Sequence, residues 1–231
     1  MGKAIITIMF DDNSPTIYNE GFIRMRPLGL VGNHAVITGN LTNDPASGLI
    51  TRQQMQEMYD AGWSILNHTR LHKNLLNEDD ASVTSEVMQG RQDLIDNGWT
   101  RSKDDFVPPF NSANEHTLSI IKQYARSCTA FLGPDVINTF PFDPYRIGRF
   151  GAGTNSVFIF KSWIDRAIDR SGQFHIYFHS IADPIGYPYP PSMFQEVMNY
   201  IAMKRDQGLV SVVTVNDLMT NYTARKRYPN G

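Results

Sequence analysis

Short apolar runs alternate with helix-sized amphipathic segments along this chain. The run Ala4–Phe10 predicts a buried strand, and similar runs predict strands at residues 35–38, 63–66, 105–110, 127–132, 174–178 and 209–215. Apolar residues recur at helical spacing over residues 51–62, 82–97, 114–124, 158–168 and 191–205. Strands that alternate with helices are typical of a parallel sheet. About seven such units predict an α/β fold, a distorted, roughly seven-stranded (β/α) barrel.

The composition is that of one ordinary folded domain. The chain has 231 residues, 41% of them hydrophobic and 19% charged, and no break in composition or internal repeat divides it. We therefore expect a single domain over residues 1–222, followed by a polar, basic tail over 223–231. The tail contains the run Arg225-Lys226-Arg227, which is typical of a solvated terminus.

Charge and cysteine content exclude several classes of protein. A net charge of −2 gives no electrostatic reason to expect a nucleic-acid partner, and a single cysteine, Cys128, excludes an internal disulfide. Ala4–Phe10 has seven residues and ends at Asp11-Asp12, so it does not resemble a secretory signal. No stretch approaches the roughly 18 apolar residues that cross a bilayer. We expect no membrane partner and a protein that is cytoplasmic as synthesised, or carried by a phage or released.

Polar residues that can bind a metal follow two of the predicted strands. Two adjacent carboxylates, Asp11 and Asp12, end the first strand, where they are costly unless something positive binds there. Neighbouring side chains of an extended chain point to opposite sides, so one carboxylate can ligate a cation while the other acts as a base. His68 and His72 are four residues apart, which lets both imidazoles face one cation if the segment makes a helical turn. Two imidazoles and a carboxylate suit zinc.

A third histidine lies at the exit of a later predicted strand. His179 follows Phe174–Phe178, and a histidine at this position can donate a proton near neutral pH. Because the C-terminal ends of barrel strands meet at one rim, we expect it near the two carboxylates.

Taken in order, these segments resemble the polysaccharide deacetylase family, carbohydrate esterase family 4, also called the NodB-homology domain. Residues 7–13 (TIMFDDN) resemble its first motif, T-F-D-D-G, and residues 67–72 (NHTRLH) match its second, N-H-[ST]-x-x-H. Residues 106–111 (FVPPFN) resemble the third, R-P-P-Y-G, and residues 176–179 (IYFH) the last. The resemblance covers nearly the whole chain.

The resemblance implies a β/α barrel with a divalent metal, commonly zinc, and it assigns a role to each motif residue. The metal ligands would be Asp12, His68 and His72. Asp11 would be the catalytic base, His179 the general acid, and the backbone N–H of Phe110 an oxyanion donor.

Three positions depart from the family pattern. Asn13 and Asn111 stand where the family has glycine, and asparagine is the residue best able to replace glycine at positive φ. Val107 stands near the arginine that pairs with the base in many members, and Arg146 or Arg149 could supply the missing charge.

These features predict an enzyme that removes N-acetyl groups from an N-acetylglucosamine-type oligo- or polysaccharide. Its partner would be the acetylated carbohydrate, and the residues expected to contact it are Pro109, Arg146, Tyr187 and Tyr189. The two tyrosines could form a sugar-stacking wall or a rigid structural loop. Three alternatives stay open: an O-acetyl esterase of the xylan type, a hydrolase of a non-sugar amide, and a non-catalytic carbohydrate-binding or virion structural barrel.

Overall fold

Strand β1 (Ala4–Asp11) organises the sheet because it is hydrogen-bonded along both edges. In the computed structural model, which describes residues 2–131, 135–183 and 188–227, β9 (Gln173–Phe178) runs parallel to one edge of β1. β2 (Asn33–Val36) pairs with the C-terminal half of the other edge, and β12 (Val210–Val212) pairs with its N-terminal half. Strands covered on both edges and both faces are apolar over most of their length. This position explains the almost continuous apolar run that begins the chain.

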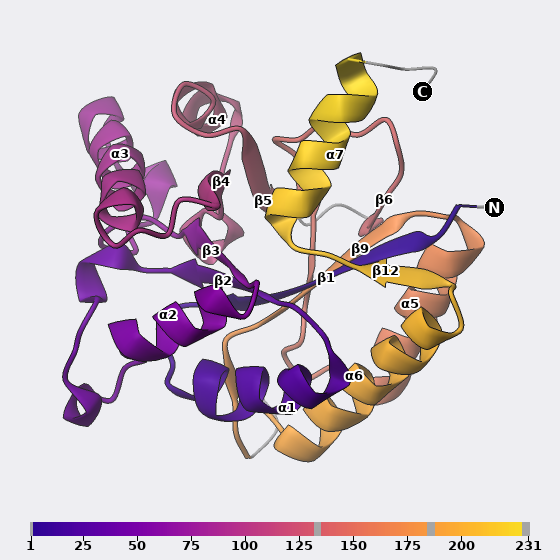
Figure 1. Ribbon diagram of the computed structural model, residues 1–231. Coiled ribbons are helices and arrows are strands. Elements are labelled where there is room, and N and C mark those ends of the chain that lie inside the picture. The colour runs from indigo at the N-terminus through magenta and orange to yellow at the C-terminus, as the bar shows by residue number, and fades with distance from the viewer. Residues whose placement is uncertain (1, 132–134, 184–187, 228–231) are drawn as a thin grey trace.

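The sheet closes on itself almost completely (Figure 1). From β9 and β1 it continues through β2, β3 (Ser64–Asn67), β4 (Ser102–Phe106), β5 (Ser127–Phe131) and β7 (Ile147–Gly148). β7 pairs with β5, while β8 (Phe150–Gly151) pairs with β9. Because Arg149 alone separates β7 from β8, this short segment joins the two edges of the sheet. The predicted single-domain, roughly seven-stranded barrel is confirmed.

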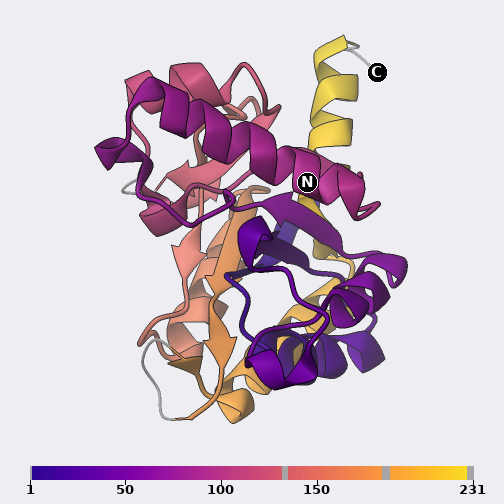
Figure 2. The same ribbon diagram turned by 90° about the vertical axis from the view of Figure 1, so that its left-hand side faces the viewer.

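Helices surround the strands (Figure 2). A π-helical turn (Ile17–Phe22) leads into the short α1, and α5 packs beside α6 along one flank in Figure 1. The helices are α1 (Ile23–Met25), α2 (Arg52–Asp60), α3 (Asp80–Asp96), α4 (Glu115–Ile121), α5 (Val157–Asp169), α6 (Pro191–Asp206) and α7 (Val215–Arg227). Two minor strand pairs complete the architecture: β6 (Ile137–Asn138) is antiparallel to β9, and β10 (Ser180–Ile181) pairs with β11 (Pro188–Tyr189). None of the helices in the described residues is long and apolar enough to span a membrane.

Local capping fixes where the helices begin. Thr51 and Asn114, the first residues of the predicted segments 51–62 and 114–124, form the capping boxes of α2 and α4. α3 begins at Asp80, two residues before the start of the predicted segment 82–97, because the Asp79 side chain accepts a hydrogen bond from the backbone N–H of Ser82.

The strand predicted over residues 105–110 is misplaced. β4 ends at Phe106, and Pro108 and Pro109 follow it. Proline has no backbone N–H to donate to a neighbouring strand, so the chain leaves the sheet before this pair. It then makes the 3₁₀ turn Pro109–Asn111.

Helix α7 closes the N-terminal end of the barrel, where the sequence pattern predicts only the end of a strand and a tail. The backbone N–H of Val215 donates to Asn33 Oδ1 at 2.7 Å, and Arg126 donates to Asn216 Oδ1 at 3.0 Å. Val215 and Met219 pack against the apolar cluster inside the barrel. α7 runs through residue 222, residues 228–231 lie outside the described part, and the division between domain and tail at 222/223 stays a prediction.

His175 is a fully buried histidine of the barrel interior. Its Nδ1 lies 2.7 Å from Thr7 Oγ1, on the neighbouring strand β1. Burial, together with the nearby Arg149, lowers the pKa of His175 to about 3. The ring is therefore neutral in the folded protein over most of the acidic range.

We expect His175 to make the protein less stable on acidification. The unfolded chain binds a proton at about pH 6.5 and the folded chain only near pH 3, so stability is intact above pH 6.5 and declines as the pH falls towards 3. At pH 5 the loss from this residue is about 2 kcal/mol. The free energy of unfolding in urea, measured with chelator present, should fall between pH 7 and pH 5 in both proteins. The fall should be smaller by that amount in His175→Gln than in the unsubstituted chain. An equal drop in both proteins would contradict the assignment.

Candidate active site

A cavity of about 260 Å³ lies at the C-terminal end of the barrel. Its walls come from the ends of β1, β3 and β9, from the turn after β4 and from the seam between β7 and β8. The residues that line it are Asp11, His68, His72, Phe110, Asn111, Arg149, Tyr177 and His179. This is the rim where barrel enzymes gather their chemistry.

Three predicted ligands, Asp12, His68 and His72, converge beside this cavity. Their candidate donor atoms all lie within 4.8 Å of one another. Asp12 Oδ1 is 3.5 Å from His68 Nε2 and 3.1 Å from His72 Nε2. The same oxygen is buried, and no described residue donates a well-aligned hydrogen bond to it. Burial alone would raise the pKa of the Asp12 carboxyl, but the two imidazoles hold it well below its ordinary value.

The histidine pair sits in a loop and not in the helical turn that its spacing predicts. Glu86 Oε2 accepts hydrogen bonds from the backbone N–H groups of Arg70 and Leu71, at 3.0 and 2.8 Å. Thr69 Oγ1 accepts one from the His72 N–H at 3.0 Å. His72 has a φ of 57°, a left-handed conformation that these bonds to the loop maintain.

Hydrogen bonds with neighbouring residues orient the candidate metal ligands. His68 Nδ1 lies 2.6 Å from the Val107 carbonyl, so it carries the proton and leaves Nε2 to face Asp12. His34 Nε2 lies 2.6 Å from the Asp12 carbonyl and donates to it. Burial lowers the pKa of His34 to about 4 and keeps the ring neutral. Sequence reasoning missed this supporting role, because a histidine at a strand start carries no motif.

The asparagine predicted to replace a motif glycine at positive φ does so at one position of two. Asn111 has a φ of 52°, as expected, whereas next to Asn13 it is Asp12 that is left-handed, with a φ of 69°. Asn13 instead ties two segments together: its amide donates to the Ile37 carbonyl and accepts from the Ile37 N–H, each at 3.0 Å.

These donors fit a divalent metal. A carboxylate oxygen with no aligned donor and two imidazole nitrogens, that of His68 with its tautomer fixed by the Val107 carbonyl, form a set suited to a tetrahedral cation with open positions. The structure therefore contains an Asp/His triad able to hold a metal ion.

Asp11 pairs with Arg149 in the interior of the barrel. The guanidinium is 1% exposed, and its Nη1 lies 2.9 Å from Oδ1 and 2.8 Å from Oδ2 of Asp11. Burial alone would raise the pKa of Asp11, but Arg149, with His68 and His179, more than offsets it and keeps that pKa below its ordinary value. Of the two arginines proposed to replace the charge missing at Val107, Arg149 is the one that pairs with Asp11.

Asn111 and Tyr177 hold Arg149 in place. Asn111 Oδ1 accepts from Nε and Nη2 of the guanidinium at 2.9 and 2.6 Å, and its Nδ2 donates to the Tyr177 hydroxyl at 3.0 Å. The guanidinium carbon lies 4.0 Å from the centroid of the Tyr177 ring. Neither side chain was a predicted site residue, although strand alternation places Tyr177 on the same face as His179.

His179 and Phe110 complete the walls of the cavity. The His179 ring is part-buried and meets the Tyr177 ring edge to face at 5.6 Å. Burial lowers the pKa of His179, while the carboxylates of Asp11 and Asp12 act in the opposite direction. Phe110 is 62% exposed, has a φ of 57° and places its ring 4.8 Å from that of His72.

The residues predicted to contact the substrate are not gathered at the cavity. Arg146 forms ion pairs with Glu115 and Asp143 and does not line it. Tyr189 is 1% exposed and packs against Phe160 and Phe178, so its ring is not available to a sugar. Pro109 is buried at the start of the turn that carries Phe110, and Tyr187 lies outside the described residues.

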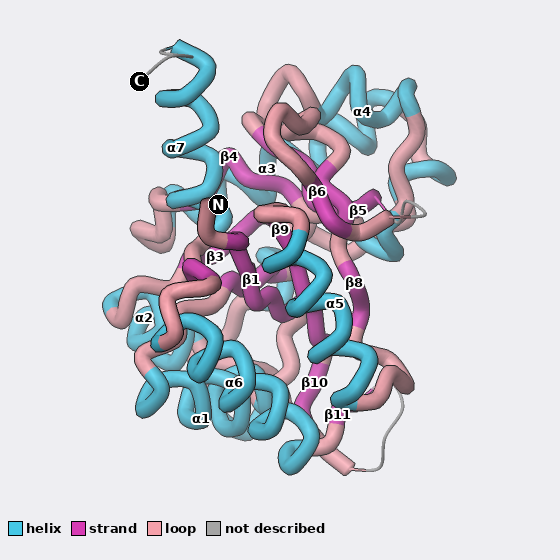
Figure 3. The backbone as a smooth tube through the Cα atoms, turned by 90° about the vertical axis from the view of Figure 1, so that its right-hand side faces the viewer, coloured by secondary structure: helices cyan, strands magenta, loops and turns pink. Residues whose placement is uncertain are grey.

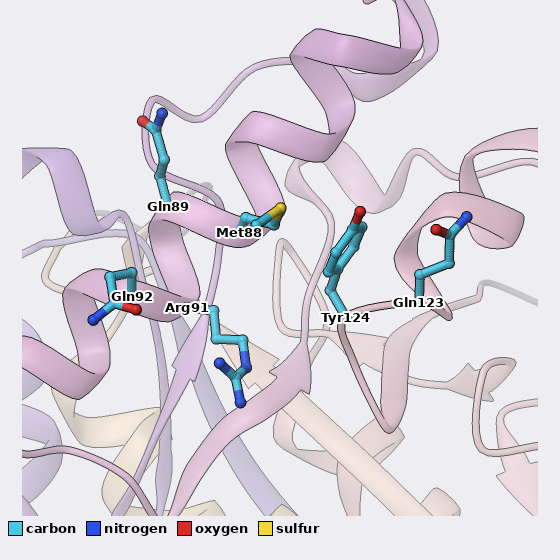
Figure 4. Close-up of a pocket in the computed structure, with 6 residues that line it drawn as sticks. All are labelled: Met88, Gln89, Arg91, Gln92, Gln123 and Tyr124. Atoms are coloured by element: carbon cyan, nitrogen blue, oxygen red, sulfur yellow. The ribbon is translucent and has the colours of Figure 1, made fainter.

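A larger cavity, about 470 Å³, lies between α3 and α4 and lacks this chemistry (Figure 4). The side chains of Gln89 and Gln92 point away from Tyr124 there. Gln89 accepts from Arg70, and Arg91 is paired with Asp104. Its polar groups are thus engaged in local contacts.

Comparisons with known proteins agree with the geometry. The family model described as polysaccharide deacetylase matches residues 1–128, more than half of the chain. No curated protein matches the chain.

Solved structures share the fold at low sequence identity. A family 4 carbohydrate esterase from Streptomyces lividans, in complex with acetate, is 17% identical, with 92% of this chain and 93% of that one covered and a TM-score of 0.61. A family 4 acetyl xylan esterase from Clostridium thermocellum, in complex with a cobalt ion, is 12% identical over 94% and 90%, with a TM-score of 0.62. A peptidoglycan deacetylase from Bacillus subtilis is 15% identical over 98% and 96%, with a TM-score of 0.57.

Proposed function

The chain belongs to the polysaccharide deacetylase family, and we propose that it hydrolyses N-acetyl groups of an N-acetylglucosamine-type oligo- or polysaccharide to release acetate. One observation carries the proposal. A buried carboxylate paired with arginine, the Asp12/His68/His72 triad and a further histidine all lie at or beside the same cavity at the C-terminal end of the barrel. An amide hydrolase needs a base, an electrophile and an acid within reach of one carbonyl group.

We propose that Asp12, His68 and His72 hold a divalent metal, with zinc expected from the two imidazoles and one carboxylate. When bound, such a cation supplies Lewis acidity to a carbonyl oxygen and lowers the pKa of a water molecule.

The other residues move the protons. Asp11 is ionised near neutral pH, because its pKa is held down by Arg149, and it takes the proton of the attacking water. The backbone N–H of Phe110 donates a hydrogen bond to the developing oxyanion. His179 protonates the departing nitrogen, and the carboxylates of Asp11 and Asp12 favour its taking up a proton for this step.

Removing the metal tests the proposal. We expect the purified protein to release acetate from acetylated chitooligosaccharides, to lose at least about 100-fold of that rate on chelation, and to regain it with added zinc. Metal content, measured alongside, should fall and rise with the rate. Acetylated xylan is the matched comparison. Release from xylan alone would assign an O-acetyl esterase, and no release from either substrate by a folded, metallated protein would contradict the proposed reaction.

A further inference from the structure

A third cavity lies at the N-terminal end of the barrel. It consists of two adjoining hollows, about 340 and 300 Å³, that share Ile5, Phe140, Gln173, Leu218 and Asn221. Figure 3 shows α7, β6 and the first residues of the chain gathered at this end. Ile5 precedes Asp11 by six residues on β1, and a strand rises about 3.3 Å per residue, so roughly 20 Å separate this cavity from the candidate active site.

Aromatic rings form one wall of this cavity. The Tyr222 ring lies 4.7 Å from that of Phe142 and 6.0 Å from that of Phe140. Phe140 is 48% exposed, so part of its ring faces solvent. A flat ring at a cavity mouth can cover the apolar C–H face of a ligand.

A buried amide lies deeper in the same cavity. Gln173 begins β9, and strand alternation places it on the same face as His175 and Tyr177, inside the barrel. It is 5% exposed, and its Oε1 is buried without a hydrogen-bond donor among the described residues. A buried acceptor without a donor is costly, so a donor supplied by a ligand would bind favourably there. Asn221, Ser171 and Ser211 add further polar groups to the lining.

The lining selects among ligand classes. Lys3 is the one charged residue among the described residues that line the two hollows, too little to hold a phosphorylated or polycarboxylate ligand. A purely apolar ligand would leave Gln173 Oε1 without a donor. Amide and hydroxyl side chains both donate and accept hydrogen bonds, as sugar hydroxyls do. The volume, the aromatic wall and the few polar groups are those of a small-molecule site.

We propose that this cavity is a secondary saccharide-binding site, which takes a neutral sugar unit between the aromatic wall and the amides of Gln173 and Asn221. Such a site would hold a stretch of carbohydrate at the end of the barrel opposite the candidate active site. The residues that form this site take no part in the proposed reaction.

Side-chain amide resonances provide a direct test. Titration of the ¹⁵N-labelled Asp11→Asn chain with N-acetylchitotetraose, and separately with xylotetraose, should shift the amide signals of Gln173 and Asn221 saturably with at least one probe. Tyr222→Ala and Asn221→Ala should each weaken this response at least fivefold in dissociation constant. Tyr124→Ala, which removes a tyrosine from the cavity between α3 and α4, is the matched control and should leave it unchanged.

The outcomes separate this site from the proposed reaction. In the chain that retains Asp11, Tyr222→Ala and Asn221→Ala should release acetate from N,N′-diacetylchitobiose at rates within twofold of the unsubstituted protein. If no probe shifts the Gln173 and Asn221 signals, or if Tyr222→Ala and Asn221→Ala, folded by thermal melting, respond normally, the secondary site is refuted. A protein that binds at this end but releases no acetate would refute only the proposed reaction.

Discussion

Asp11→Asn should lower kcat for acetate release by about 10²–10⁴-fold, the usual contribution of a placed proton-transfer group. Asparagine has the same shape as aspartate but cannot take a proton from water. Its amide oxygen can still accept from Arg149, which Asn111 also holds from the other side. We therefore expect a folded protein with normal metal content and a KM close to that of the unsubstituted chain. The measurement is kcat and KM on an acetylated chitooligosaccharide, with metal stoichiometry.

Two further variants serve as a comparison and a control for Asp11→Asn. His179→Gln should give a loss of similar size if His179 protonates the leaving nitrogen. Asp96→Asn, on the exposed face of α3, removes a carboxylate far from the cavity and should leave kcat unchanged. If Asp11→Asn, fully metallated, kept a kcat within tenfold of normal, Asp11 would not be the base.

The convergence of Asp12, His68 and His72 could be predicted because each of these residues lies just beyond the end of a buried strand. A buried parallel strand has an apolar sequence, so the point where Asp11 and Asp12 interrupt it marks the end of β1. The same holds for His68 after β3 and His179 after β9. Since the C-terminal ends of parallel strands share one rim, the order of strands along the chain is enough to place these residues together.

The partner of Asp11 could not be predicted in the same way. Arg146 and Arg149 are three residues apart, in a segment without hydrophobic periodicity. β7 and β8 have two residues each, too few for alternation to show which side chains face the interior. Long-range strand pairing decides which arginine enters the barrel. β7 pairs with β5 and β8 pairs with β9, so Arg149, which lies between β7 and β8, points into the barrel.

The burial of Tyr189 could not be predicted for a related reason. A tyrosine between prolines predicts a rigid turn but not the direction of its ring. Tyr189 lies on β11, whose pairing with β10 brings it against Phe178 in the core. Helix α7 was missed because its amphipathic pattern is weak. The apolar residues of its first half pack against the N-terminal end of the barrel, and a contact at such long range is not visible in the sequence.

Arg149→Met should destabilise the fold by about 3–5 kcal/mol, the usual effect of removing one partner of a buried ion pair. Asp11 would remain in the interior without the guanidinium that offsets its burial, and Asn111 Oδ1 would lose two donors. The measurement is the free energy of unfolding in urea at pH 7, with chelator present so that metal binding does not contribute.

Combining substitutions shows whether the loss comes from the pair itself. Asp11→Asn/Arg149→Met removes both charges, so it should be more stable than Arg149→Met by at least about 1 kcal/mol, because the uncompensated carboxylate is gone. Arg146→Met is the matched control: its ion pair with Glu115 is exposed and screened by solvent, so its loss should leave the free energy of unfolding nearly unchanged. If Arg149→Met were no more destabilising than Arg146→Met, the buried pair would not hold the seam of the barrel, and the guanidinium would act on Asp11 without supporting the fold.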